Sequence, residues 1–220
     1  MKILIKYISF FTLLILMQSV SIAAEANNIS ADEALVRLKD GNHHYITMHL
    51  KHPDQSKKRR HELLRGQHPF VIVLSCSDSR VPPEVIFDQG LGDIFEIRNA
   101  GNVLDEHVIG SIEYAVVHCG VKLVVVLSHE DCGAVTAAIK NNKESKYIES
   151  LTESIKPAIP QKTKKTVKDL ITETAKNNAV LSVSTIIKSD PIISDYVLNH
   201  GVKVIPAFYY LDSGFVEFLN

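Results

Sequence analysis

Four largely apolar runs of residues constrain the fold of this chain more than any other feature. They span residues 70–74, 94–97, 123–127 and 202–209, and a polar cluster follows each of the first three at once. Strands of a parallel sheet are buried on both faces and therefore form nearly continuous apolar segments. The runs predict four strands of this kind.

Helical segments alternate with the predicted strands. Residues 30–50 begin with Ser30, and Glu33 stands three positions later, as in a capping box. Residues 108–119 and 163–188 predict two further helices. Strands that alternate with helices indicate an α/β fold with a mainly parallel sheet flanked by helices. In such sheets ligands bind at the carboxyl ends of the strands, where the polar clusters of this chain lie.

The length and composition of the chain favour a single globular unit. The 220 residues are 45% apolar and 22% charged, which is ordinary for a folded protein with one hydrophobic core. We expect one domain over residues 25–220. The polar, proline-containing residues 140–165 indicate a surface excursion from it.

Residues 1–24 have the pattern of a secretory signal peptide. Lys2 and Lys6 precede an apolar stretch over residues 8–20, and small residues follow. Cleavage is expected after Ala23, Ala24 or Ala26. The apolar stretch is shorter than the about 20 residues that a membrane span needs, although an uncleaved N-terminal anchor is the alternative. We expect an exported protein, in the periplasm or secreted, with no membrane span after cleavage.

The charge of the mature chain excludes an electrostatic surface for nucleic acid. Without Lys2 and Lys6 the chain has 24 − 2 = 22 basic and 25 acidic residues, a net charge of −3. The basic residues 57–60 indicate the solvated start of a short helix. Three cysteines are too few for a disulfide framework, so either one pair is bridged or some thiols bind a metal.

Two of these cysteines and one histidine follow the predicted strands. Cys76 follows the first run, and His129 and Cys132 follow the third. Two thiolates and an imidazole suit zinc, and three protein ligands leave a fourth position open, as in catalytic sites. Two other interpretations remain: a Cys76–Cys132 disulfide, or buried structural thiols beside a core histidine.

An acidic residue, Asp78, and a basic residue, Arg80, follow closely after the first cysteine. Asp78 can accept a hydrogen bond from zinc-bound hydroxide, and Arg80 can hold that carboxylate with a bidentate fork. A surface ion pair is the alternative interpretation of these two residues.

The segments Cys76-Ser77-Asp78-Ser79-Arg80 and His129-x-x-Cys132-Gly133 resemble the two signature segments of β-class carbonic anhydrases. The similarity covers residues 66–135 closely and most of the mature chain more loosely. It implies a zinc lyase (carbonate dehydratase) that hydrates carbon dioxide reversibly to bicarbonate by means of zinc-bound hydroxide. It also implies one zinc per subunit on Cys76, His129 and Cys132, with Asp78 and Arg80 as the catalytic dyad. In a closed state of this family the aspartate replaces the water on the zinc.

The resemblance further implies a substrate pocket and an oligomer. The expected pocket residues are Gln67, Phe95, Ala100, Tyr114 and Gly133, and in the family the positions of Phe95 and Tyr114 are often supplied across a dimer interface. Tyr114 and His118 share a helical face and are candidates for a proton relay, although a structural role for His118 is an equal alternative. We expect a homodimer or homotetramer with the first helix laid across a partner subunit. Cys119 is expected to be a packed free thiol.

Three other functions compete with this interpretation. Relatives with the same fold hydrolyse carbonyl sulfide or carbon disulfide, and one sequence does not distinguish these substrates. A non-catalytic zinc or anion-binding module is disfavoured, because three ligands and a dyad leave an activated open position. A redox thiol protein is disfavoured because the chain lacks the Cys-x-x-Cys that such proteins use.

Overall fold

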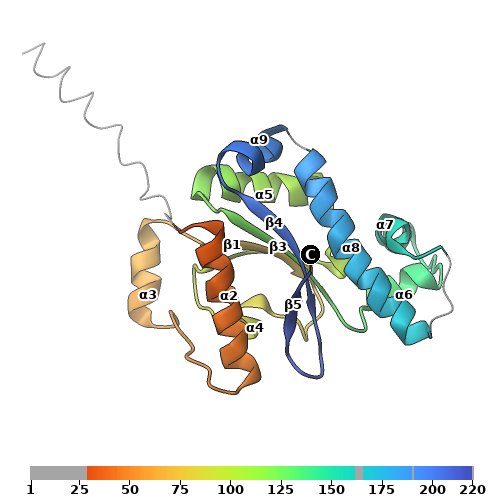
Figure 1. The fold of residues 1–220 in the computed structure, drawn as a ribbon, viewed down its shortest axis with the longest axis horizontal. Helices are drawn as coiled ribbons and strands as arrows, with labels where there is room; N and C mark the ends of the chain where they lie inside the picture. Colours follow the sequence, from red (N-terminus) through yellow and green to blue (C-terminus); the bar gives the residue numbers. More distant parts are fainter. Residues whose placement is uncertain (1–28, 162–165, 190, 220) are drawn as a thin grey trace, which may run out of the picture.

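A five-stranded sheet forms the centre of the computed structural model, which describes residues 29–161, 166–189 and 191–219 (Figure 1). Its order is β2-β1-β3-β4-β5, and its first four strands are parallel. The strands are β1 Val71–Cys76, β2 Ile94–Asn99, β3 Leu123–His129, β4 Lys203–Tyr209 and β5 Val216–Phe218. The predicted mainly parallel α/β fold is confirmed. The short β5, which runs antiparallel to β4, was not predicted, because three residues carry too little pattern.

The two central strands are buried along their whole length, as the apolar runs predict. Their side chains alternate between the faces of the sheet because a strand has a period of two residues. Val71, Val73 and Val125 enter one core cluster, and Ile72 and Val124 enter the cluster on the opposite face. Both faces of the sheet therefore need a cover of helices.

Helix α2 (Ala31–Ile46) covers the first face together with the short helix α4 (Pro83–Ile86). Its capping box is formed, since the Glu33 carboxylate accepts from the Ser30 N–H and the Ser30 hydroxyl accepts from the Glu33 N–H. Ala31, Ala34 and Leu38 are buried against the sheet of the same chain. The helix ends four residues before the predicted position 50, and Met48 just after it has a φ of 57°.

The opposite face is covered by α5 (Glu106–Cys119), α8 (Val167–Ser189) and α9 (Pro191–Asn199). Asp105 caps α5, and Gly120 ends it in the left-handed conformation. The predicted helix over residues 163–188 corresponds to α8. Residues 162–165 lie outside the described ranges, as does the predicted signal peptide over residues 1–24.

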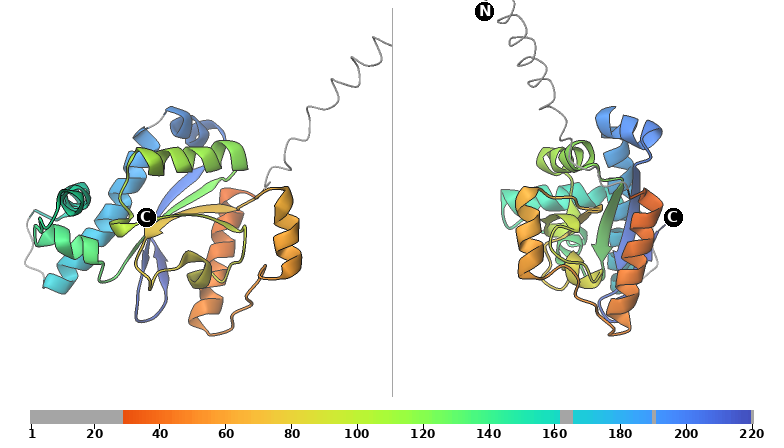
Figure 2. Two further views of the ribbon diagram at one scale, coloured as in Figure 1. Left: turned by 180° about the vertical axis from the view of Figure 1, so that it is seen from behind. Right: turned by 90° about the vertical axis from the view of Figure 1, so that its left-hand side faces the viewer.

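A third core cluster lies beyond the carboxyl ends of β1 and β3. Helices α6 (Gly133–Ile139) and α7 (Lys146–Ile155) lie beside α8 there, away from α2 (Figure 2, left). The expectation of a surface excursion over residues 140–165 was incomplete, because Thr152 and Ile155 of α7 are buried. Three 3₁₀ turns complete the described chain: η1 Leu63–Arg65, η2 Ala100–Asn102 and η3 Lys156–Ala158.

The basic residues 57–60 lie in helix α3 (Lys57–Glu62), which buries none of its residues. This agrees with the predicted solvated helix. Within the described ranges, no helix combines the length and the apolar character needed to cross a bilayer.

Candidate metal centre

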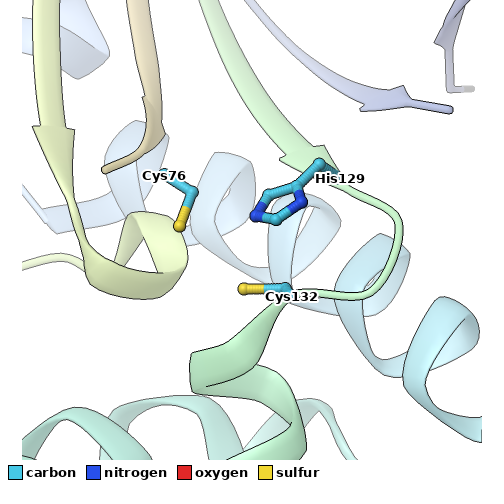
Figure 3. A group of neighbouring side chains, drawn as sticks. All are labelled: Cys76, His129 and Cys132. Atoms are coloured by element: carbon cyan, nitrogen blue, oxygen red, sulfur yellow. The ribbon is translucent and has the colours of Figure 1, made fainter. Parts of the chain in front are cut away.

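Cys76, His129 and Cys132 come together at the carboxyl ends of β1 and β3 (Figure 3). One ligand atom of each lies within 4.8 Å of the others. The pairing of Ser75 with Leu127 explains this, because it brings the last residue of β1 level with the end of β3. After β1 the chain forms β2 on one side and then β3 on the other, so the group lies at the topological switch point of the sheet.

The three side chains are buried and suit a zinc ion. His129 Nδ1 donates to the Glu130 carbonyl at 2.7 Å, so the lone pair of the ring is on Nε2. Nε2 is buried and has no hydrogen-bond partner among the described residues, which is costly unless a ligand satisfies it. Two sulfurs and one such nitrogen are a donor set that zinc prefers.

The cysteines of this group are not joined by a disulfide. Cys76, Cys132 and the more distant Cys119 are all free and buried, so Cys119 is the packed free thiol that was expected. A hydrogen bond between the two sulfurs lowers the pKa of Cys76 to about 4, whereas the same bond together with burial raises the pKa of Cys132. The Cys76 thiolate that a metal requires therefore forms readily.

Asp78 and Arg80 form a bidentate pair beside the three ligands. Arg80 Nε donates to Asp78 Oδ1 at 2.9 Å and Nη2 to Oδ2 at 2.7 Å, while the Arg80 backbone N–H donates to Oδ1 at 2.9 Å. These bonds to Arg80 hold the pKa of Asp78 at about 2, so the carboxylate is ionised at neutral pH. Asp78 Oδ2 lies 4.0 Å from His129 Nε2, so this carboxylate borders the metal group and is not an isolated surface ion pair.

Arg98 supports the same loop and was not predicted as part of the site. Its guanidinium donates to the Cys76 carbonyl at 2.9 Å and to the Asp78 carbonyl at 2.6 Å. The sequence offered one signal, a polar cluster directly after the second apolar run. Only the pairing of Cys76 with Asn99 reveals which carbonyls Arg98 reaches.

Two of the predicted pocket residues lie at the metal group. Ala100 begins η2 and precedes Gly101, whose backbone N–H donates to Cys76 Sγ at 3.3 Å. Gly133 is the exposed first residue of α6, next to Cys132. A Cβ at Gly133 would meet no atom within 4 Å, so there is open space beside its backbone.

The remaining predicted residues lie away from the metal group of their own chain. Gln67 is exposed and precedes β1, whereas Cys76 ends it, and six residues of strand span about 20 Å. Phe95 pairs with Ile72, four residues (about 13 Å) below the level of Cys76. One protomer does not bring Gln67 or Phe95 to the three ligands.

The Phe95 ring of β2 lies beside Tyr114 of α5, and Tyr114 lies beside His118 of the same helix. The Phe95 and Tyr114 rings are 6.3 Å apart, the Tyr114 and His118 rings are 5.0 Å apart, and 51% of Tyr114 is exposed. These three residues form an aromatic row, in which Phe95 is partly buried and Tyr114 and His118 are exposed. Their roles in a pocket and a proton relay stay predictions.

Comparison with known proteins gives a consistent set of relatives. A family model described as carbonic anhydrase matches residues 71–216. Carbonic anhydrase 2 of Mycobacterium tuberculosis is 35% identical over 181 residues, which cover 80% of this chain and 87% of that protein. A carbonic anhydrase of Mycolicibacterium smegmatis is 44% identical over 138 residues, 61% of this chain and 66% of that protein.

Solved structures agree with the fold. The β-carbonic anhydrase CafA of Aspergillus fumigatus superposes with a TM-score of 0.70 at 26% identity, covering 86% of this chain and 90% of that chain. A structure from a study of two tetrameric β-carbonic anhydrases of Sordaria macrospora superposes with a TM-score of 0.67 at 25% identity, covering 73% and 85%.

Removal of one sulfur tests the metal group. We expect Cys76→Ala to lose its zinc during dialysis against a mild chelator, because two remaining ligands hold the ion too weakly. Elemental analysis of the purified protein measures this. The control is Cys119→Ala, which removes a buried thiol outside the group and should keep the metal content of the parent. Equal zinc in both variants would contradict the assignment.

Proposed function

The chain belongs to the carbonic anhydrase family and catalyses the reversible hydration of carbon dioxide, and we propose that Cys76, His129 and Cys132 hold its zinc beside the Asp78–Arg80 pair. The observation that carries the proposal is the convergence of three buried ligand atoms within 4.8 Å, with one lone pair unsatisfied. When bound, zinc lowers the pKa of a coordinated water to about 7 and so supplies hydroxide at neutral pH. We further propose one zinc per subunit.

Asp78 orients the nucleophile in this proposal. Because Arg80 keeps it ionised, the carboxylate can only accept a hydrogen bond, so it fixes the proton of the attacking oxygen and leaves a lone pair directed at carbon dioxide. Arg80 donates a hydrogen bond to each carboxylate oxygen of Asp78 and so holds this side chain away from the nearby metal position. In the closed state of the family, the aspartate takes that position. Arg98 fixes the backbone that carries Cys76 and Asp78.

Carbon dioxide is the substrate favoured over the sulfur analogues, because the relatives found are named carbonic anhydrases. Gly133 adjoins the ligand Cys132 and has open space beside its backbone, and Ala100 precedes Gly101, which contacts Cys76 Sγ. Gly133 and Ala100 are proposed as pocket residues on this ground.

The role of the carboxylate is tested with Asp78→Asn. We expect the variant to keep its zinc but to lose about 10²- to 10⁴-fold in kcat, because the amide can donate to the nucleophile and misorient it. Stopped-flow hydration of carbon dioxide, paired with zinc analysis, measures both quantities.

The matched control is Asp131→Asn, since Asp131 is exposed, adjoins the ligand Cys132 and has a φ of 52° that asparagine also adopts. It should keep its activity within about twofold, as surface substitutions usually have small effects. Full activity in Asp78→Asn would remove this carboxylate from the mechanism.

We propose that the active oligomer completes the pocket with residues of a second subunit. Gln67 and Phe95 lie far from the ligands of their own chain, and the Tyr114 and His118 end of the aromatic row is exposed, so these residues are available to a partner subunit. The tetrameric relatives from Sordaria macrospora support a dimer or tetramer. In this assembly Gln67, Phe95 and Tyr114 line the partner's pocket, His118 extends the proton relay, and the outer face of α2 contacts the partner.

Mixed oligomers test the sharing of Gln67. Neither Gln67→Ala nor Cys76→Ala alone should hydrate carbon dioxide at the rate of the parent, because one lacks the amide and the other lacks the zinc. In a co-expressed mixed oligomer, the Gln67→Ala subunit keeps its zinc ligands and receives an intact Gln67 from its partner. We expect purified mixed oligomers, isolated through two different tags, to recover activity. If each Gln67 served its own chain, the mixed oligomer would be as inactive as either variant alone.

We also propose that residues 1–24 direct export and that residues 25–220 form the mature periplasmic enzyme. The support is the sequence pattern of two lysines, an apolar stretch and small residues, which ends shortly before α2 begins. N-terminal sequencing of protein recovered from a periplasmic fraction should give a chain that begins just after Ala23, Ala24 or Ala26. Recovery of the intact N-terminus in the membrane fraction would instead support the uncleaved anchor.

A further inference from the structure

The sulfur of Cys76 receives a hydrogen bond from a turn that follows the neighbouring strand. Gly101, in η2, donates its backbone N–H to Cys76 Sγ at 3.3 Å, and this bond is buried. Figure 3 shows the turn beside the sulfur. The position of this peptide group therefore determines whether the sulfur keeps this one of its hydrogen bonds.

The turn is held in a conformation that requires glycine. Gly101 has a φ of 75°, and a Cβ there would lie 2.7 Å from Ile155 Cδ1 and 2.9 Å from Ala134 Cβ. Asn99 closes the turn at its base, because its side chain donates to the Val103 carbonyl and accepts from the Val103 N–H. Packing by Ile155 and Ala134 and the Asn99 bonds fix the turn from two sides, and both Asn99 bonds go to Val103 and not to the oxygen of Gly101.

A buried asparagine on α8 makes that contact. Asn178 Nδ2 donates to the Gly101 carbonyl oxygen at 3.0 Å, and only 3% of Asn178 is exposed. This bond links α8 to the turn across 77 positions of sequence. Gly101 therefore accepts a hydrogen bond from Asn178 at its carbonyl oxygen and donates one to the Cys76 sulfur from its N–H.

We propose that Asn178 is a positioning residue for the metal centre, because it anchors Gly101 so that the backbone N–H of that residue stays on the Cys76 sulfur. The proposal rests on the zinc site proposed above. Hydrogen bonds to a ligating sulfur reduce the electron density that it donates and fix its direction, and residues that orient ligands in this way affect metal binding strongly. Asn178 itself contacts neither the ligand atoms nor the substrate.

Substitution of Asn178 in the full-length protein tests this through the sulfur itself. Asn178→Leu keeps the approximate shape of the side chain and removes the donor. In the cobalt-substituted variant, we expect the sulfur-to-cobalt charge-transfer band to move to longer wavelength, because a sulfur that has lost the hydrogen bond from Gly101 is easier to oxidise. We also expect zinc transfer to a chelating dye to be about tenfold faster.

Asn177→Leu is the matched control. Asn177 is the adjacent residue of α8 and makes the same kind of bond, from its side-chain Nδ2 to the Ala158 carbonyl at 3.1 Å, but to η3 and not to the turn beside Cys76. It should keep the parent's cobalt band and zinc transfer rate. A purely structural role for Asn178 would lower thermal stability while leaving both readouts like those of Asn177→Leu, and that result would overturn the proposal.

Asn178→Ala provides a second variant if the leucine side chain prevents folding, since alanine removes the donor without adding bulk. It should show the same shift of the band and the same faster release. The cobalt spectrum of the unmutated parent protein distinguishes a failure of this proposal from a failure of the zinc site on which it rests. If the parent takes up cobalt without any sulfur-to-cobalt band, the metal site fails and this inference with it. If the parent has the band and both Asn178 variants keep it unshifted, only the role of Asn178 is wrong.

Discussion

The parallel pairing of β1 with β3 is the interaction on which the rest of the site depends. Both strands are buried along their length, so the apolar contacts that stabilise the sheet also fix their register. Because the pairing aligns their carboxyl ends, Cys76 at the end of β1, His129 at the end of β3 and Cys132 just after β3 meet at one point. The packing of these two buried strands thereby positions the three ligand atoms.

A layer of hydrogen bonds between main chain and side chains then converts this meeting point into an ordered site. Arg80 holds the Asp78 carboxylate, Arg98 holds the backbone on either side of it, and Gly101 contacts the Cys76 sulfur. Each donor comes from a loop or strand end next to β1. Charge-assisted bonds of this kind fix direction as well as distance, which the orientation of a small nucleophile requires.

The length of one strand explains why a single subunit is insufficient for the proposed pocket. Gln67 lies before β1 and Cys76 ends it, so the extended backbone between them holds the two residues apart. Phe95 is similarly placed low on β2. The chain therefore offers its metal group at one end of the sheet and the further residues proposed for the pocket at the other, an arrangement that suits reciprocal use by two subunits.

The sequence by itself determined the parallel α/β class and the four main strands, because buried parallel strands need continuous apolar runs. It predicted the grouping of Cys76, His129 and Cys132 with Asp78 and Arg80 through the resemblance of two motifs that stand directly after these runs. The tertiary structure alone decided what depends on contacts between distant segments. Arg98 reaches its carbonyls through the β1–β2 pairing, α7 buries Ile155 within a segment that reads as polar, and Asn178 meets Gly101 across 77 positions. No local pattern encodes such contacts, because packing of α7 and α8 over the strand ends creates them.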